Sequence, residues 1–212
     1  MSIRVGINGF GRIGRNCLRA LTESHLKEKI TIAHINDLAP IETLAHLLQY
    51  DSVHGPFQGN ITIEENQLKV NETSISISQE KDPSQCPWAQ HNVDVVFECT
   101  GRFTHKDQAA LHLTGGAKKV IISAPGKAVD ATIVYGVNHH QLTSSMTVIS
   151  NASCTTNCLA PIVQPLHHTF GIANGLMTTI HAATGDQQVV DTAHADLRRA
   201  RSALCSMIPT KT

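Results

Sequence analysis

The sequence predicts an α/β protein with a doubly wound parallel sheet, followed by the start of an α+β domain. Three observations carry this prediction. An apolar strand pattern at residues 3–7 runs directly into a glycine-rich turn and a helical apolar stripe. Strand-like and helix-like patterns then alternate towards residue 150, as in proteins built from βαβ units. A polar turn with two cysteines, residues 150–158, then opens a segment of different character, so we place the domains at 1–152 and 153–212.

The composition argues against several classes of protein. The 212 residues carry 17 basic and 17 acidic side chains, a balance that gives no support for a nucleic-acid or membrane-surface role. We find no signal-peptide pattern and no apolar run long enough to span a bilayer. The six cysteines lack the spacing of a disulfide framework and are read as reduced thiols. We therefore expect a cytoplasmic protein that binds neither nucleic acid nor membrane.

The glycine-rich turn has the pattern G-x-G-x-x-G. Gly9 permits a tight turn, Gly11 lets the backbone approach a pyrophosphate, and Gly14 lets the helix pack closely on the strand. The N-terminus of the helix then faces the phosphates. Strand, motif and helix follow in the required order, which predicts a dinucleotide site of the Rossmann type. The alternative is an ordinary βαβ unit with a glycine-rich turn.

The second strand pattern, residues 30–35, ends at Asn36 and Asp37. Asp37 lies 23 residues after Gly14, at the end of the second strand, where a carboxylate can bond the ribose hydroxyls of the adenosine. The same negative charge would repel a 2′-phosphate, which favours NAD over NADP. The alternative role for Asp37 is that of a helix cap.

The rest of the first half alternates between helix and strand signals. Period-two alternation over residues 57–79 predicts an antiparallel excursion within the parallel unit. Ligands bind at the carboxyl ends of strands in such sheets, so Thr100 and Ser123 are candidate cofactor-lining residues, with ordinary turns as the alternative. The remaining predicted helices are 40–50 and 106–113, and the remaining predicted strands are 93–99, 119–123, 131–135 and 146–149.

Cys154 lies between the strand pattern 146–149 and a helical stripe over 159–166, at or near a helix N-terminus. Unpaired amides and the helix dipole there stabilise a thiolate, so we expect a lowered pKa for this thiol. The alternatives are a small buried cysteine or a metal ligand. Cys158 lies four residues on, but this spacing without a second ligand pair gives no metal site. A redox pair is disfavoured too, because that spacing suits a disulfide poorly.

The last part of the chain offers a base and a group of cations. Alternating residues predict a strand over 176–182 that ends near His181. Cys154 and His181 could meet as nucleophile and base, although a strand histidine is more often structural. The arginines that follow, among them Arg199, could grip a phosphate or form a solvated charged run.

Nine strings of residues, spread in order over the whole chain, share one resemblance: 8–15, 36–38, 50–55, 98–101, 122–125, 136–138, 150–158, 179–181 and 208–209. Together they resemble the bacterial phosphorylating glyceraldehyde-3-phosphate dehydrogenases. The resemblance implies that Cys154 attacks the aldehyde of glyceraldehyde 3-phosphate and that His181 is the base. A thiohemiacetal would pass hydride to NAD, and inorganic phosphate would release 1,3-bisphosphoglycerate from the resulting thioester. The backbone amide of Cys154 and the His181 side chain would stabilise the oxyanion.

The resemblance also implies binding residues and an assembly. The family's phosphate-site positions fall on Ser153, Thr155, Thr184, Arg199 and Thr212. Its NAD positions fall on Arg12, Ile13, Asp37 and Ser123, with Lys81 where many members have arginine. Residues 183–206 resemble the S-loop, which lies near a neighbouring subunit's cofactor in a homotetramer. One departure is Gly185, where asparagine is common in the family.

The family's catalytic domain continues far beyond Thr212, so we expect a truncated chain. The runner-up activity is that of erythrose-4-phosphate dehydrogenase, which shares the cysteine, the histidine and NAD but hydrolyses the thioester. An inactive NAD-binding fragment is the alternative from a different class. Phosphate dependence of NADH formation separates the two enzymes, and NAD binding without turnover identifies the fragment.

Overall fold

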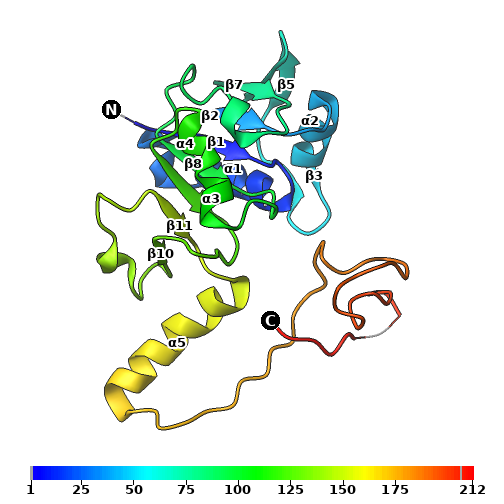
Figure 1. The fold of residues 1–212 in the computed structure, drawn as a ribbon. Helices are drawn as coiled ribbons and strands as arrows, with labels where there is room; N and C mark the ends of the chain where they lie inside the picture. Colours follow the sequence, from blue (N-terminus) through cyan, green and yellow to red (C-terminus); the bar gives the residue numbers. More distant parts are fainter. Residues whose placement is uncertain (1, 206) are drawn as a thin grey trace. The chain divides into compact units, whose positions relative to one another are not determined.

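The computed structural model describes residues 2–205 and 207–212, which form two compact units, one up to residue 161 and one over 162–212 (Figure 1). Within the described residues, the first unit holds a nine-stranded sheet in the order β10-β11-β9-β8-β1-β2-β7-β6-β5. Its strands are β1 Ile3–Asn8, β2 Ile30–Asn36, β5 Ile61–Glu64, β6 Gln67–Val70, β7 Thr73–Ser78, β8 Val95–Glu98, β9 Lys119–Ile122, β10 Ala131–Thr132 and β11 Val148–Ser150. A two-stranded sheet pairs β3 Tyr50–Asp51 with β4 Gly55–Pro56.

The parallel part of the large sheet is doubly wound, as predicted. β1 pairs in parallel with β2 on one side and with β8 on the other. From β1 the chain adds β2 and β7 in one direction, and from β8 it adds β9, β11 and β10 in the other. The winding therefore reverses between β1 and β8. In open α/β sheets, the carboxyl ends of the two strands at such a reversal border the ligand crevice.

The predicted antiparallel excursion is also confirmed. β7 lies parallel to β2, whereas β6 is antiparallel to β7 and β5 is antiparallel to β6. The two-residue turn between β5 and β6 places Glu65 and Asn66 at φ 50° and 63°. Two successive left-handed residues match the right-handed twist of a hairpin.

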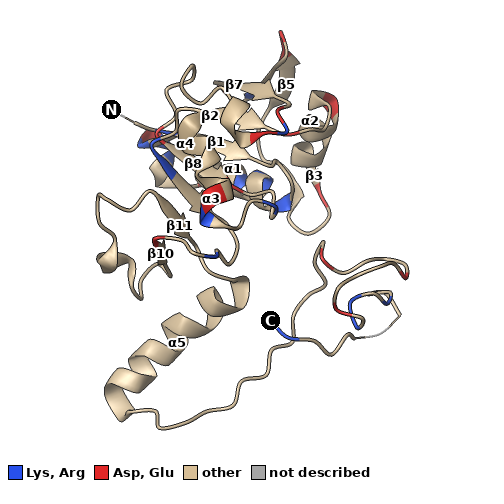
Figure 2. Ribbon diagram, viewed as in Figure 1, with Lys and Arg blue, Asp and Glu red and all other residues tan. Residues whose placement is uncertain are grey.

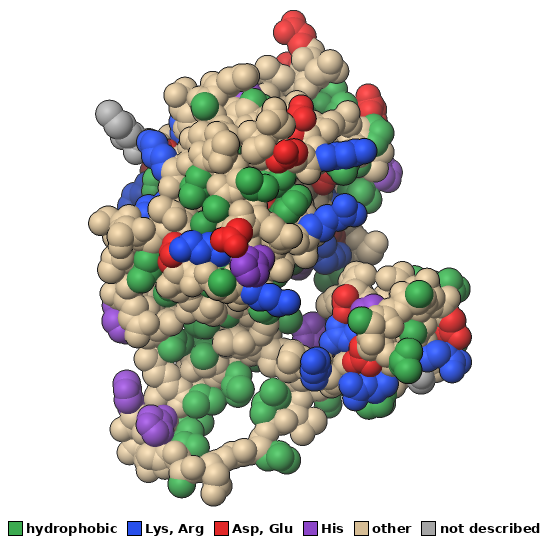
Figure 3. Space-filling view, viewed as in Figure 1, with side chains coloured by type: hydrophobic (Ala, Val, Ile, Leu, Met, Phe, Trp, Pro, Cys, Tyr) green, Lys and Arg blue, Asp and Glu red, His purple; other side chains and the backbone are tan. Residues whose placement is uncertain are grey.

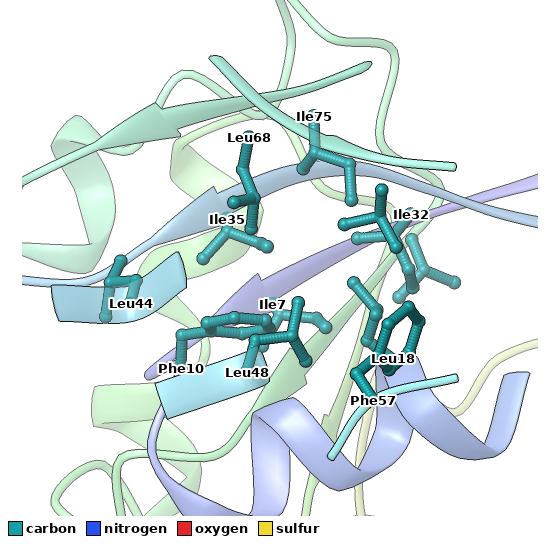
Figure 4. Close-up of a cluster of buried hydrophobic side chains, with 12 residues drawn as sticks. Ile7, Phe10, Leu18, Ile32, Ile35, Leu44, Leu48, Phe57, Leu68 and Ile75 are labelled. Atoms are coloured by element: carbon teal, nitrogen blue, oxygen red, sulfur yellow. The ribbon is translucent and has the colours of Figure 1, made fainter. Parts of the chain in front are cut away.

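Both faces of the sheet are covered by apolar side chains. Helices α1 Arg12–Glu23 and α2 Ile41–Gln49 pack Leu18, Leu44 and Leu48 onto one face (Figure 4). That cluster includes Ile7, Phe10, Ile32, Ile35, Phe57, Leu68 and Ile75. On the other face Trp88 is fully buried, and a Cβ added at Gly6 of β1 would meet its ring at 2.6 Å. The sheet therefore lies between two packed layers, which fix its strand ends in place.

Short helices complete the first unit. These are η1 His25–Glu28, η2 Pro83–Gln85, α3 Lys106–Ala109, α4 Leu111–Thr114 and η3 His139–Gln141. The helix predicted over 106–113 is thus two short helices. The strand predicted over 131–135 is reduced to β10, because Val134 turns the chain: its amide donates to Asn138 Oδ1 at 2.8 Å and its carbonyl accepts from the Asn138 amide.

The last helix, α5 Cys154–Phe170, contains no Lys, Arg, Asp or Glu (Figure 2). The helix is confirmed, but its apolar side chains are exposed, from Val163 at 36% to Phe170 at 78%. Figure 3 shows hydrophobic side chains gathered over this helix. No helix in the described part of the chain is both long and apolar enough to cross a membrane.

The strand predicted over 176–182 is wrong, because these residues have no regular secondary structure. Leu176 is 98% exposed and Ile180 is 94% exposed. A strand makes no backbone hydrogen bonds of its own and needs a paired neighbour. Alternating apolar residues alone do not form a strand when no neighbouring strand among the described residues pairs with them.

Candidate active site

The three glycines of the turn after β1 each meet a different environment. Gly9 has φ +88°, and a Cβ there would lie 2.8 Å from the backbone nitrogen of Thr100. A Cβ at Gly14 would lie 2.3 Å from the carbonyl oxygen of Gly9, whereas one at Gly11 would meet nothing within 4 Å. Gly9 is therefore needed for the turn and Gly14 for helix packing, and Gly11 faces open space.

No side chain in the described part of the chain caps the N-terminus of α1. Its N-cap is Gly11, which has no side chain to cap the first-turn amides. Uncapped amides and the helix dipole together attract phosphate. Arg12 and Ile13 follow, with Ile13 47% exposed and the Arg12 guanidinium 3.2 Å from Asp51 Oδ1. The amides of His54 and Val53, together with Arg12, hold the pKa of the Asp51 carboxyl well below its usual range.

Asp37 is fixed beside this turn at the end of β2. Its Oδ2 accepts a hydrogen bond from the Phe10 amide at 2.7 Å, and its Oδ1 accepts one from the Ala39 amide at 2.9 Å. The carboxylate thus links the glycine-rich turn to the loop after β2. A fixed negative charge at this strand end is suited to bonding ribose hydroxyls.

The other predicted cofactor residues follow neighbouring strands. Thr100 comes after β8, and its backbone amide and hydroxyl both donate to the carboxylate of Glu98. Ser123 comes after β9 and donates to the Glu98 carbonyl oxygen at 3.0 Å. Lys81, in the loop after β7, is exposed. The turn, Asp37, Thr100 and Ser123 therefore all lie at the carboxyl ends of parallel strands.

Cys154 is the first residue of α5 and is exposed. Ser153 caps the helix, because its hydroxyl accepts from the Thr156 amide at 3.0 Å. Ala152 is buried and has φ +59°, a left-handed conformation that costs about 1–2 kcal/mol for a residue with a Cβ. Strained residues of this kind are concentrated at functional sites, where the surrounding structure holds them in place.

The strained turn is held on both sides. The buried Ser150 hydroxyl accepts from the amides of Ala152 and Gly126, both at 3.0 Å, and donates to the Ala124 carbonyl oxygen at 2.7 Å. The Asn157 side-chain amide donates to the carbonyl oxygens of Asn151 and Ser153. These bonds fix the Cys154 backbone at the point where strand becomes helix. Thr155 is the next residue of the helix and is half-buried.

The remaining predicted residues belong to the second unit. His181 is exposed, with its Nδ1 2.7 Å from the Ala182 carbonyl oxygen, and the Thr184 amide donates to Gln187 Oε1 at 2.8 Å. Thr212 is exposed. Cys154 belongs to the first unit and His181 to the second, so their pairing stays a prediction.

Arg199 is engaged within its own unit. Its guanidinium bonds the carboxylate of Asp186, the hydroxyl of Thr210 at 3.2 Å and the Lys211 carbonyl oxygen at 2.7 Å. These contacts bring residues 186, 199 and 210–211 together. For Arg199 to bind a phosphate, at least one of these hydrogen bonds must be replaced by a bond to the phosphate.

The comparisons with known proteins agree on one family. Residues 3–106 match the model described as glyceraldehyde 3-phosphate dehydrogenase, NAD binding domain, and residues 153–212 match the C-terminal domain of the same enzyme. The chain belongs to the glyceraldehyde-3-phosphate dehydrogenase family. Its NAD-binding part has the Rossmann-type sheet expected for that cofactor.

Members of this family align with the whole chain. The chromosomal glyceraldehyde-3-phosphate dehydrogenase of Cupriavidus necator is 59% identical over 213 aligned residues, which are 100% of this chain and 63% of the relative. The Pseudomonas aeruginosa enzyme is 57% identical and that of Geobacillus stearothermophilus 53% identical, over 64% and 63% of their lengths. The chain thus spans about 63% of the length of the glyceraldehyde-3-phosphate dehydrogenases it matches.

Sequence reasoning missed one group of residues next to this family's glycine-rich turn. Glu98, Asn8 and His112 are buried and hydrogen-bonded to one another. The available signal was a glutamate at the end of an otherwise apolar strand, Val95–Glu98. A carboxylate in such a place needs polar partners, which points to a network even before its members are known.

Proposed function

We propose that this chain catalyses the NAD-dependent oxidative phosphorylation of glyceraldehyde 3-phosphate to 1,3-bisphosphoglycerate. The observation that carries the proposal is the position of Cys154 at the start of α5, in a segment that matches the family's C-terminal domain. A helix N-terminus stabilises the thiolate, which is the nucleophilic form of cysteine. The strained, capped turn before Cys154 supports this role, because it fixes the backbone that carries the thiol.

The residues of the first unit fit NAD. Gly11 leaves open space for a pyrophosphate, the uncapped amides of α1 attract its charge, and Asp37 offers a carboxylate for the ribose. Arg12, Ile13, Thr100, Ser123 and Lys81 complete the proposed cofactor residues. NAD, when bound, supplies the acceptor for the hydride that leaves the substrate. The carboxylate of Asp37 would repel a 2′-phosphate and so favours NAD over NADP.

In the proposed mechanism the Cys154 thiolate attacks the aldehyde carbon and forms a thiohemiacetal. The Cys154 backbone amide and His181 stabilise the oxyanion, and His181 takes the hydroxyl proton as the thioester forms. A phosphate oxygen then attacks the thioester carbon, and the Cys154 thiolate leaves, which releases the acyl phosphate. Ser153, Thr155, Thr184, Arg199 and Thr212 are the proposed phosphate-binding residues.

We also propose the organisation in which this chemistry takes place. Residues 1–152 form the NAD-binding domain and 153–212 the first part of the catalytic domain. The chain works in the cytoplasm and assembles as a homo-oligomer, a tetramer in the intact family, with residues 183–206 near a neighbouring subunit's cofactor. The exposed apolar side chains of α5 support association with further protein surface.

The test is NADH formation from glyceraldehyde 3-phosphate with and without inorganic phosphate. We expect formation to depend on phosphate, to disappear in Cys154→Ser, and to persist in Cys158→Ser. Cys158 is the matched control because it is an exposed cysteine one turn further along the same helix. NADH formation from erythrose 4-phosphate without phosphate would assign the alternative dehydrogenase instead. Turnover that survives in Cys154→Ser would contradict the mechanism.

A further inference from the structure

A buried carboxylate lies beneath the glycine-rich turn. Glu98, the last residue of β8, is 1% exposed. Its Oε2 accepts from Asn8 Nδ2 at 2.6 Å and contacts His112 Nε2 at 2.9 Å. Its Oε1 accepts from the Thr100 amide at 2.8 Å and from the Thr100 hydroxyl. The side chain of Glu98 thus has four polar contacts and almost no contact with solvent.

The contact with His112 is also one in which Glu98 accepts. The indole nitrogen of Trp88 donates to His112 Nδ1 at 3.0 Å, and an indole N–H can only donate. Nδ1 is therefore the acceptor nitrogen of the ring, and the proton of the neutral imidazole is on Nε2, facing Glu98. All four partners are then donors, which matches an ionised carboxylate.

These bonds connect the loops at the reversal point of the sheet. Asn8 is the residue before Gly9, and Thr100 is the residue against which a Cβ at Gly9 would collide. Asn8 Oδ1 accepts in turn from Asn36 Nδ2 at 2.8 Å, and Asn36 is the residue before Asp37. One carboxylate is therefore bonded, directly or through Asn8, to the ends of β8, β1 and β2.

We propose that Glu98 is a positioning residue for NAD, which holds Thr100 and the glycine-rich turn in their binding conformation. This inference rests on the proposed function, since it concerns the same cofactor site. If the network only filled space in the core, apolar residues could do so without the desolvation cost of a buried charge. Charge-assisted bonds to four donors fix loop geometry more tightly, and a preformed site loses less entropy when the cofactor binds.

The test uses Glu98→Gln in the full 212-residue chain. Whichever way the new amide turns, its NH₂ group faces at least one group that can only donate: Asn8 Nδ2 and His112 Nε2 on one side, or the Thr100 backbone amide on the other. We expect the Kd for NAD to rise about tenfold or more, the equivalent of ~1.4 kcal/mol. Kd is measured by titration well below the thermal midpoint of each variant, so that all of the protein is folded.

Two further variants separate positioning from general stability. In Asn8→Asp combined with Glu98→Gln, the amide donates to the new carboxylate. His112 Nε2 lies 3.4 Å from Asn8 Nδ2, so it can donate to the same carboxylate, and most of the lost NAD affinity should return. Asp130→Asn is the matched control, because Asp130 also accepts from several donors, Lys106 and the amides of Thr147 and Val148. This variant replaces a hydrogen-bonded carboxylate by an amide at a position away from the glycine-rich turn, so the Kd for NAD should stay unchanged.

Each outcome decides the inference. An unchanged Kd in Glu98→Gln, with only a lower thermal midpoint, would overturn it and leave the proposed function standing. If Glu98→Gln does not fold, Thr100→Val removes one donor at a partly exposed position, and an unchanged Kd there would equally overturn it. Failure of the unmodified chain to bind NAD would overturn the proposed function and this inference together.

Discussion

The contact between Gly14 and Gly9 allows a prediction with a worked magnitude. In Gly14→Ala the new methyl group would lie 2.3 Å from the Gly9 carbonyl oxygen and 3.0 Å from Ile7 Cγ2. Neither atom can move away easily, since one is backbone of the turn and the other belongs to a fully buried side chain. Overpacking of this kind lowers the free energy of unfolding by about 1–3 kcal/mol, and we expect a clash with backbone to be at the upper end of this range. The higher helix propensity of alanine offsets roughly 1 kcal/mol of this, so we expect the free energy of unfolding to fall by about 2 kcal/mol.

Gly11→Ala is the matched control three residues earlier. Its methyl group would meet nothing within 4 Å, and the φ of −70° lies outside the left-handed region that favours glycine. We expect stability within about 1 kcal/mol of the unmodified chain, since only a glycine N-cap is changed. The methyl group would nevertheless stand where the pyrophosphate approaches, so NAD affinity should be lost.

Urea denaturation and NAD titration of the two variants give the comparison. Gly14→Ala should lose both stability and NAD affinity, whereas Gly11→Ala should lose NAD affinity alone. If Gly14→Ala is as stable as the unmodified chain, the helix moves away from the turn without cost. The reasoning from close packing would then be refuted.

Three further predictions concern charge and reactivity. Burial, with His91 nearby, lowers the pKa of His34 to about 3. In the unfolded chain His34 takes up a proton at its ordinary pKa of 6.5, whereas in the folded chain it does so only near pH 3. The free energy of unfolding should therefore fall as pH drops from 6.5 towards 3, by at most ~1.4 kcal/mol per pH unit. His34→Asn should flatten that slope in urea titrations, whereas replacement of the exposed His25 should not. Asp37→Asn should weaken NAD binding and narrow the preference for NAD over NADP, and an unchanged ratio of the two Kd values would contradict the role of its charge. Cys154 should be alkylated faster than Cys158 when followed by mass spectrometry, because the helix N-terminus stabilises its thiolate; equal rates would count against this.

Much of the first unit could be predicted because its signals are local. The G-x-G-x-x-G turn, the strand before it and Asp37 at the end of β2 are short patterns whose geometry depends on nearby residues. The segment with period-two alternation, residues 57–79, likewise forms hairpins between neighbouring strands, with turns at Glu65–Asn66 and Asn71. Such segments fold as their local pattern indicates, so sequence and structure agree.

The rest depended on contacts between distant residues. Glu98 meets Asn8 across 90 positions of sequence, and no spacing rule connects the two. The segment 176–182 shows the converse, because its alternation is a true strand pattern that has no paired neighbour among the described residues. The pairing of Cys154 with His181 is a long-range prediction of the same kind, drawn from chemistry rather than from local pattern.

Calorimetric titration of the 212-residue chain with NAD and with NADP tests most directly whether the turn from Gly9 to Gly14 holds the cofactor. We predict that NAD binds, that NADP binds more weakly, and that Gly11→Ala binds neither while remaining folded. NAD binding of equal strength in Gly11→Ala, or no NAD binding by the unmodified chain, would contradict the assignment.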